Sequence, residues 1–251
     1  MKLKNAVRAL TPPLVWEAMK LAKRNVWDRG AEPLLSRYHG LQELDKKLEK
    51  YVDIDGGFFI EIGGWDGVTF SNSLYFERHR NWRGVLVEPA PSEYLKCRRN
   101  RPNAKVFCFA CVPFDYTDKY VPMVYCASMS VTNVADLAFD PRAHAEDGRK
   151  FLAEGEDLYE FGAVAKPLST ILAENDITDA IDLLILDVEG YELPVLKGID
   201  FARHAPRFIC VEAWDLAAIT TFLAAKGYEY VEQISKHDHL FRRSGADAGS
   251  R

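Results

Sequence analysis

The sequence lacks any uninterrupted apolar run of the roughly 18 residues that a membrane-spanning helix requires. Its N-terminal apolar stretches are broken by charged residues and by Pro12-Pro13, which excludes the pattern of a secretory signal. Cysteine is scarce, with five in 251 residues, and an odd number is not typical of a disulfide framework. These absences predict a cytoplasmic protein.

A surplus of positive charge is also absent, because 32 lysines and arginines face 37 aspartates and glutamates, for a net charge of −5. We therefore expect no nucleic-acid partner. Residues 1–29 differ from the rest, since they hold seven lysines and arginines against Glu17 and Asp28. We expect a basic helical extension over residues 1–50. Within it, residues 1–29 are expected to lie peripherally on the inner face of an anionic membrane, or to pack on the domain or on a second copy in a homo-oligomer.

What the chain does have is enough apolar content, 48% of 251 residues, for one well-buried α/β domain, which we place at residues 51–243. Apolar runs alternate with helix-like segments, which predicts a doubly wound, mostly parallel sheet with an antiparallel edge strand. The expected strands cover residues 58–62, 84–88, 104–110, 121–125, 181–187, 207–212, 228–234 and 239–242. The expected helices cover residues 41–51, 72–80, 91–100, 168–175, 191–197 and 215–226.

The interval 128–166 breaks this alternation, being rich in Asp, Ala, Gly and Pro. We expect an insertion or lid on the substrate side, and the alternative is a surface excursion without function. Residues 244–251 have the composition of a disordered tail.

A glycine-rich turn follows the strand that begins at Phe58. Gly63, Gly64 and Gly67 allow the backbone to turn tightly against a ligand. In a dinucleotide fingerprint a second glycine follows the first by two residues, so that a pyrophosphate can approach, but here that position is Trp65. The turn therefore favours S-adenosylmethionine over NAD, with a nicotinamide oxidoreductase as the alternative.

The segments around this turn offer further cofactor contacts. Glu88 ends the next apolar strand, where a carboxylate can accept both hydroxyls of a ribose. Ser71 or Asn72 caps the helix that begins near Ser73, and the free N–H groups of a helix N-terminus can bind a carboxylate.

A second motif lies in residues 181–198, where a buried strand delivers acidic residues to its carboxyl end. These are Asp187, Glu189 and, in the following helix, Glu192. Ligands of open α/β sheets bind at that edge. Burial of a carboxylate at the end of so apolar a strand costs free energy unless the group has polar partners or a function in the site. We therefore single out Asp187 as a candidate functional residue.

Together with Ser71-Asn72-Ser73, the strand ending in Glu88-Pro89 and Arg101-Pro102, these two motifs resemble the FkbM family of S-adenosylmethionine-dependent methyltransferases over about residues 56–242. The resemblance implies a Rossmann-like class I methyltransferase fold with a seven-stranded sheet, and O-methylation, commonly of a sugar hydroxyl in a glycan or natural product. The implied cofactor-binding residues run from the methionine end to the ribose and the adenine, and are Glu61, Gly63, Gly64, Asp66, Gly67, Ser71, Asn72, Glu88, Pro89 and Ala110.

Methyl transfer from a sulfonium requires alignment and removal of the hydroxyl proton, so a base or a metal is expected. Asp187 and Glu212 end two neighbouring strands and together could bind Mg²⁺. In the competing interpretation Asp187 or Glu189 contacts substrate and cofactor, and His239 or His144 is the general base. Glu212 and His239 also have plain structural alternatives, as a partner of backbone amides and as a polar residue of the last strand.

The expected acceptor is a saccharide or glycan, free or lipid-linked, and this expectation comes from the resemblance alone. A different class of function is a scaffold in a glycan assembly complex that binds S-adenosylmethionine without catalysis. The acidic residues Glu61, Asp187 and Glu189 favour the enzyme.

Overall fold

The computed structural model describes residues 37–134, 137 and 139–245. The basic segment 1–29 lies outside these residues, as does most of the predicted tail. None of the described helices is long and apolar enough to cross a membrane.

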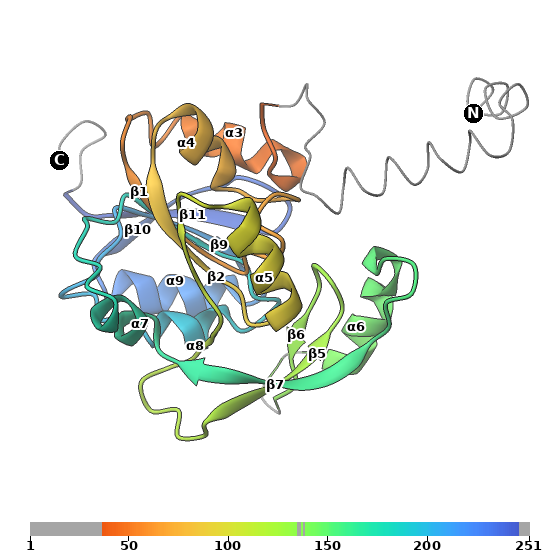
Figure 1. The fold of residues 1–251 in the computed structure, drawn as a ribbon. Helices are drawn as coiled ribbons and strands as arrows, with labels where there is room; N and C mark the ends of the chain where they lie inside the picture. Colours follow the sequence, from red (N-terminus) through yellow and green to blue (C-terminus); the bar gives the residue numbers. More distant parts are fainter. Residues whose placement is uncertain (1–36, 135–136, 138, 246–251) are drawn as a thin grey trace, which may run out of the picture. The chain divides into compact units, whose positions relative to one another are not determined.

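The core is a seven-stranded sheet with the strand order β10-β11-β9-β8-β1-β2-β3 (Figure 1). The strands are β1 (Phe58–Ile62), β2 (Arg83–Val87), β3 (Lys105–Phe107), β8 (Leu183–Leu186), β9 (Phe208–Glu212), β10 (Tyr228–Gln233) and β11 (Asp238–Arg243). All neighbours pair in parallel except β11, which is antiparallel to both β9 and β10. The predicted fold class is confirmed. The antiparallel strand lies second from the edge, because the short turn after β10 returns β11 between β10 and β9.

Three helices cover each face of this sheet. The helices α3 (Leu44–Glu49), α4 (Leu74–His79) and α5 (Pro91–Asn100) contribute to one buried apolar cluster. The helices α7 (Leu168–Glu174), α8 (Glu192–Leu196) and α9 (Leu216–Ala224) contribute to another. Two apolar layers on one sheet explain why its central strands have continuous apolar runs and no alternation.

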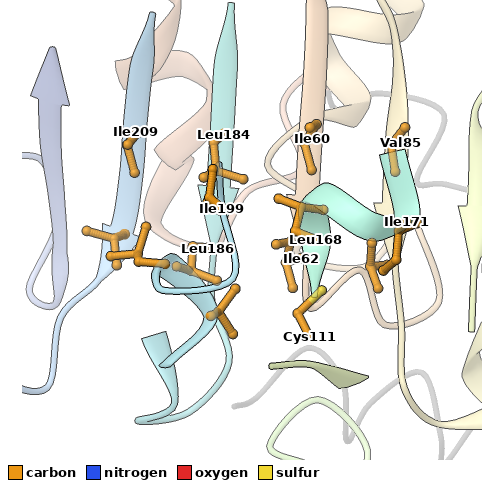
Figure 2. Packing of buried hydrophobic residues seen from close by; sticks show 14 of the residues in the cluster. Ile60, Ile62, Val85, Cys111, Leu168, Ile171, Leu184, Leu186, Ile199 and Ile209 are labelled. Atoms are coloured by element: carbon orange, nitrogen blue, oxygen red, sulfur yellow. The ribbon is translucent and has the colours of Figure 1, made fainter. Parts of the chain in front are cut away.

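The parallel register aligns side chains of like kind across the sheet. Ile60 of β1 lies opposite both Val85 of β2 and Leu184 of β8, and Leu184 lies opposite Ile209 of β9. Figure 2 shows these four side chains in one row across the sheet. Each is completely buried, and burial of an aliphatic side chain of this size stabilises the fold by about 1.5–3 kcal/mol.

Local signals set where several helices begin. Pro91 occupies the first turn of α5, where its missing N–H costs nothing. Asp215 caps α9 by accepting a hydrogen bond of 3.0 Å from the N–H of Ala218. In the same way Asp140 caps α6 (Pro141–Gly148), accepting from the N–H of Arg142 at 2.9 Å.

The insertion has a sheet of its own, with the order β4-β7-β5-β6. Its elements are β4 (Ala110–Cys111), β5 (Tyr120–Tyr125), β6 (Val131–Thr132), α6, a 3-10 turn at Arg149–Phe151, and β7 (Tyr159–Lys166). The single predicted strand over 104–110 is wrong, since β3 ends at Phe107 and β4 pairs with β7 in the second sheet. Residues 128–166, the interval predicted to be an insertion, contain β6, α6 and β7, and the second sheet extends back to β4. A substrate-side role for this region stays a prediction. Most of β7 is exposed or half-buried, so its sequence carries no apolar alternation.

A buried carboxylate fastens the insertion to the core. The hydroxyl of Tyr125 in β5 donates to Glu93 Oε1 in α5 at 2.9 Å. Lys96 Nζ also lies 3.0 Å from Glu93, and it lies 3.7 Å from Glu156 of the insertion. The side chain of Glu93 is only 1% exposed, and these bonds replace water at Oε1, while Oε2 has no hydrogen-bond partner among the described residues.

The domain starts earlier than the sequence predicts. The compact unit begins at Tyr38, because Leu44 and Leu48 of α3 are buried in the core. The predicted helix over 41–51 is a 3-10 turn at Leu41–Glu43 followed by α3, with left-handed backbone at Gln42 and Glu43 between them. Residues 38–50 therefore belong to the domain, which corrects the predicted boundary.

We expect Tyr125→Phe to loosen the insertion, because Glu93 stays buried but loses a hydrogen-bond donor. The expected cost is about 1–3 kcal/mol, the penalty for leaving a buried acceptor unsatisfied. Hydrogen exchange of the β7 amides should become faster than in the wild type. Tyr159→Phe is the matched control, because this ring stacks on Tyr125 at 4.7 Å and is 45% exposed. Equal exchange rates in the two variants would contradict the proposed anchor.

Candidate active site

Two adjoining hollows lie at the carboxyl ends of β1, β2, β8 and β9. The inner cavity encloses about 640 Å³ and the outer cleft about 2010 Å³, both including space open to solvent. Their common wall is formed by Ile62, Gly63, Trp65, Ser128, Asp187 and Glu189. The glycine-rich turn and the second acidic motif, far apart in sequence, therefore meet where the hollows join.

Gly63 permits the close approach of β1 to β8 at this wall. Its φ is +89°, and a Cβ on it would lie 1.9 Å from the carbonyl oxygen of Asp187. No side chain fits in that space. Gly63 lines both hollows, whereas Gly64 lines the outer cleft only. A contact of either glycine with a cofactor stays a prediction.

Glu61 ties the end of β1 to the start of α4. Its carboxylate accepts hydrogen bonds from the N–H of Asn72 at 2.8 Å, from Ser71 Oγ at 2.9 Å and from Ser73 Oγ at 2.6 Å. The fully buried Arg101 adds a cation 3.8 Å away. Glu61, Ser71 and Asn72 all line the outer cleft, but Glu61 and Ser71 are already engaged with each other. Their first task is to hold the turn in shape.

Two predicted cofactor contacts, Asp66 and Gly67, line neither hollow. Asp66 Oδ1 accepts from the N–H groups of Val68 and Thr69 at 2.8 and 2.7 Å, which closes the turn upon itself. Gly67 has a φ of +79° and its carbonyl accepts from Arg101 at 3.0 Å. These residues shape the turn from behind, which corrects the prediction that they face the ligand.

Glu88 lines the inner cavity, as do Pro89 and Ala110. Its carboxylate accepts from the N–H of Trp65 at 2.8 Å and of Ala90 at 2.9 Å. Burial raises the pKa of Glu88 to about 7, although these two N–H groups act in the opposite direction. An acceptor of this kind suits a ligand with neighbouring hydroxyl donors.

The rest of the inner cavity suits a flat, weakly polar group. Its walls include Phe109, Cys111, Val188, Tyr191 and Val195. An apolar slot with a carboxylate at one end and a glycine turn at the other matches a nucleoside carrying an amino-acid tail. The residues present therefore fit S-adenosylmethionine.

Three carboxylates gather at the join of the two hollows. One oxygen each from Asp187, Glu189 and Glu212 lies within 4.8 Å of the others. Asp187 is accessible from the hollows, but protein surrounds it otherwise, so burial and then the charges of Glu212 and Glu189 hold its pKa well above the usual range. Burial, Glu189 and Asp238 also raise the pKa of Glu212, more than the hydrogen bond from Trp214 lowers it. A carboxyl group with a raised pKa keeps its proton up to a pH closer to neutral.

The insertion brings His144 to this cluster. Its Nε2 lies 3.0 Å from Glu189 Oε2. Its ring contacts Phe139 and Trp214, with centroid distances of 4.9 and 5.6 Å, and these two rings also contact each other at 4.3 Å. Glu189 is held with a φ of +52°, an uncommon conformation for this residue type, and Gly190 follows with a φ of +91°. His144, left open by the sequence as one of two candidate bases, is therefore part of the site.

The other candidate base, His239, lines neither hollow. It is buried in β11, and its Nδ1 lies 3.3 Å from the hydroxyl of Tyr230. The neighbouring Asp238 faces the outer cleft, and successive strand residues point to opposite sides. The structure therefore does not support the predicted catalytic role of His239.

Sequence reasoning missed the insertion residues in the inner cavity. Ser128, Ser130 and Thr132 all line it, and they are every second residue along the chain. The pattern Ser-x-Ser-x-Thr has the period of a strand with one polar face, and this was the available signal. Trp214 of the outer cleft was also missed.

A family model described as the methyltransferase FkbM domain matches residues 61–230. Among solved structures with a similar fold, a methyltransferase from Geobacter sulfurreducens is 12% identical with a TM-score of 0.43, covering 97% of this chain and 96% of that one. A TehB-like SAM-dependent methyltransferase from Corynebacterium glutamicum is 12% identical with a TM-score of 0.41, covering 93% and 100%. A SAM-dependent methyltransferase from Thiobacillus denitrificans, in complex with S-adenosyl-L-homocysteine, is 8% identical with a TM-score of 0.33, covering 82% and 72%. No curated protein matches the sequence.

The family match spans more than half of the chain and includes both acidic motifs.

We expect Asp187→Asn to stabilise the protein at high pH. A carboxyl whose pKa is raised by folding contributes its stability at low pH and loses it as the pH rises through the folded-state pKa. The variant should therefore melt about 2–6 °C above the wild type at pH 8, and the two should converge near pH 4. Asp115→Asn, at an exposed position, is the control and should follow the wild type. A variant that melts below the wild type at pH 8 would refute the raised pKa.

Proposed function

The chain belongs to the FkbM family of S-adenosylmethionine-dependent methyltransferases, and we propose that it transfers the methyl group to a hydroxyl of a saccharide. The observation that carries the proposal is the carboxylate cluster of Asp187, Glu189 and Glu212, placed where the inner cavity joins the outer cleft. A donor in one hollow and an acceptor in the other would meet at these groups.

In the proposal the inner cavity holds the cofactor. Glu88 accepts the ribose hydroxyls, Pro89 and Ala110 lie along the nucleoside, and Gly63 lets the backbone pass close to the amino-acid tail. Bound there, S-adenosylmethionine supplies a methyl group on a positively charged sulfur. Enclosure of this group excludes water as a competing acceptor.

The outer cleft suits a saccharide because it combines aromatic faces with polar groups. Trp65, Phe70, Phe151 and Trp214 line it, next to Asp187 and Glu189. Phe70 and Trp214 are 39% and 45% exposed, which is high for such large apolar side chains. Aromatic faces can pack on the C–H face of a sugar ring while carboxylates accept its hydroxyls. The sugar belongs to a polysaccharide or a glycosylated natural product, free or lipid-linked.

The cluster would accept the proton that the acceptor hydroxyl loses. A proton acceptor works best when its pKa lies near the working pH, and burial and mutual repulsion bring these carboxyl groups in that direction. The methyl–sulfur bond breaks as the methyl–oxygen bond forms, and the hydroxyl proton passes to the cluster. From there the contact between Glu189 and His144 offers it a route toward the outer cleft.

The same three carboxylates have the oxygen chemistry that Mg²⁺ prefers. Such an ion would be held by these carboxylates and would supply Lewis-acid activation of a hydroxyl. Activity that survives EDTA would leave the cluster as the proton acceptor, whereas activity that is lost in EDTA and restored by Mg²⁺ would assign this role to the ion.

We expect the affinity for S-adenosylhomocysteine to rise with pH through Glu88. Hydroxyl donors bind the carboxylate better than the carboxylic acid, so binding releases a proton below a pKa of about 7. Calorimetry should show about 5- to 10-fold tighter binding at pH 8 than at pH 6. Glu88→Gln is the control that isolates this group, and its weaker binding should lose most of that dependence. An unchanged slope in Glu88→Gln would assign the proton elsewhere.

We expect Asp187→Asn to lower kcat by about 10²–10⁴-fold, since it removes a proton acceptor. Its affinity for S-adenosylhomocysteine should change by less than about threefold, because it leaves the cofactor contacts in place. The assay follows labelled methyl groups from S-adenosylmethionine onto a panel of saccharides, and the label should survive mild alkali as a methyl ether does. His239→Gln should stay within about twofold of the wild type. Label that is lost in alkali would indicate a methyl ester and overturn the hydroxyl acceptor.

A further inference from the structure

Thr132 places an unsatisfied hydroxyl in the inner cavity. The residue ends β6 of the insertion, pairs with Met123 of β5 and is only 5% exposed. Among residues 37–134, 137 and 139–245, its Oγ1 has no hydrogen-bond partner. We infer that this hydroxyl contacts the adenine end of the cofactor, so that the insertion takes part in cofactor recognition. This inference rests on the proposed cofactor site.

A buried hydroxyl without a partner is unfavourable, so its persistence in a cavity points to a ligand. The neighbouring residue on the same face shows the contrast. Ser130 Oγ donates to the carbonyl of Ala127 at 2.8 Å and accepts from the N–H of Cys126 at 3.0 Å. The insertion thus satisfies one hydroxyl internally and leaves the other, on a residue that also lines the cavity, without a partner among the described residues.

The lining residues indicate which part of the ligand Thr132 meets. Residues shared with the outer cleft, such as Gly63 and Asp187, mark the end where the methyl group is transferred. Thr132 lines the inner cavity only, like Phe109 and Ala110. Glu88, also confined to the inner cavity, serves the ribose. The remaining polar part of the ligand in this region is the edge of the adenine, which offers both donors and acceptors to a hydroxyl.

Recognition by Thr132 would link the cofactor to the closure of the site. The same insertion carries His144, which contacts Glu189, and Tyr125, which anchors it to α5. A cofactor held from the insertion side would therefore favour the arrangement that also brings His144 to the carboxylates.

The test compares Thr132→Val, which keeps the shape and removes the hydroxyl, with Thr132→Ser, which keeps the hydroxyl. Calorimetry is run with S-adenosylhomocysteine and with 5′-methylthioadenosine, which retains the nucleoside but lacks the amino-acid tail. We expect Thr132→Val to bind both ligands about 5- to 10-fold more weakly, and Thr132→Ser to stay within about twofold of the wild type. Equal affinity of Thr132→Val and the wild type for both ligands would overturn the inference, as would a loss confined to S-adenosylhomocysteine.

The melting temperature of the ligand-free protein distinguishes a binding role of the Thr132 hydroxyl from a structural one, because only loss of a structural contact would lower it. Thr132→Val removes an unpaired group, so the protein should melt at the same or a higher temperature. Ser130→Ala, the control, breaks bonds within the protein and should melt about 2–4 °C lower. A lower melting temperature for Thr132→Val without loss of affinity would show that the hydroxyl serves the fold. Wild-type protein that binds neither ligand would instead refute the proposed function.

Discussion

The crowding of three carboxylates at the carboxyl edge of the sheet is the constraint on which the site depends. Asp187, Glu189 and Glu212 come from two neighbouring strand ends. Burial and the neighbouring carboxylates disfavour the charged forms of Asp187 and Glu212. Such an arrangement opposes folding at neutral pH, so the rest of the domain must offset it. The two apolar layers that cover the sheet provide that stability. The consequence is that Asp187 and Glu212 are carboxyl groups that can exchange a proton near neutral pH.

The glycine-rich turn acts on the site mainly through the backbone. The side chains of Glu61, Asp66 and Arg101 form hydrogen bonds within the turn and with the start of α4. Gly63 then brings the turn to within van der Waals distance of the Asp187 carbonyl, where no other residue fits. The motif is thus a device that positions main chain around a ligand, and few of its side chains are left to contact one. Glu88 is the exception, since its carboxylate faces the inner cavity.

The insertion completes both hollows and is a second folded layer with its own sheet. It lines the inner cavity with Ser128, Ser130 and Thr132, and the outer cleft with His144 and Phe151. The buried bond between Tyr125 and Glu93 holds it on the core. The walls of both hollows therefore depend in part on the insertion, which also packs Val121, Met123 and Ala163 into the apolar cluster of the central sheet.

The sequence by itself determined the central sheet, the helices on its faces, the cofactor turn and the acidic strand ends, because each of these rests on a local pattern. A strand buried on both faces is a continuous apolar run, and a parallel sheet sends the carboxyl ends of its strands to one edge. The tertiary structure alone decided the rest. The pairing of β7 with β5 is long-range and leaves most of β7 exposed. The sequence of β7 therefore shows no alternation of apolar and polar residues that would predict a strand. The alternation of side chains along β11 places His239 on the side away from the cleft. The packing of α6 on β5 and β6 within the insertion brings His144 to Glu189. These contacts join segments far apart in the chain, and composition and periodicity carry no information about such distances.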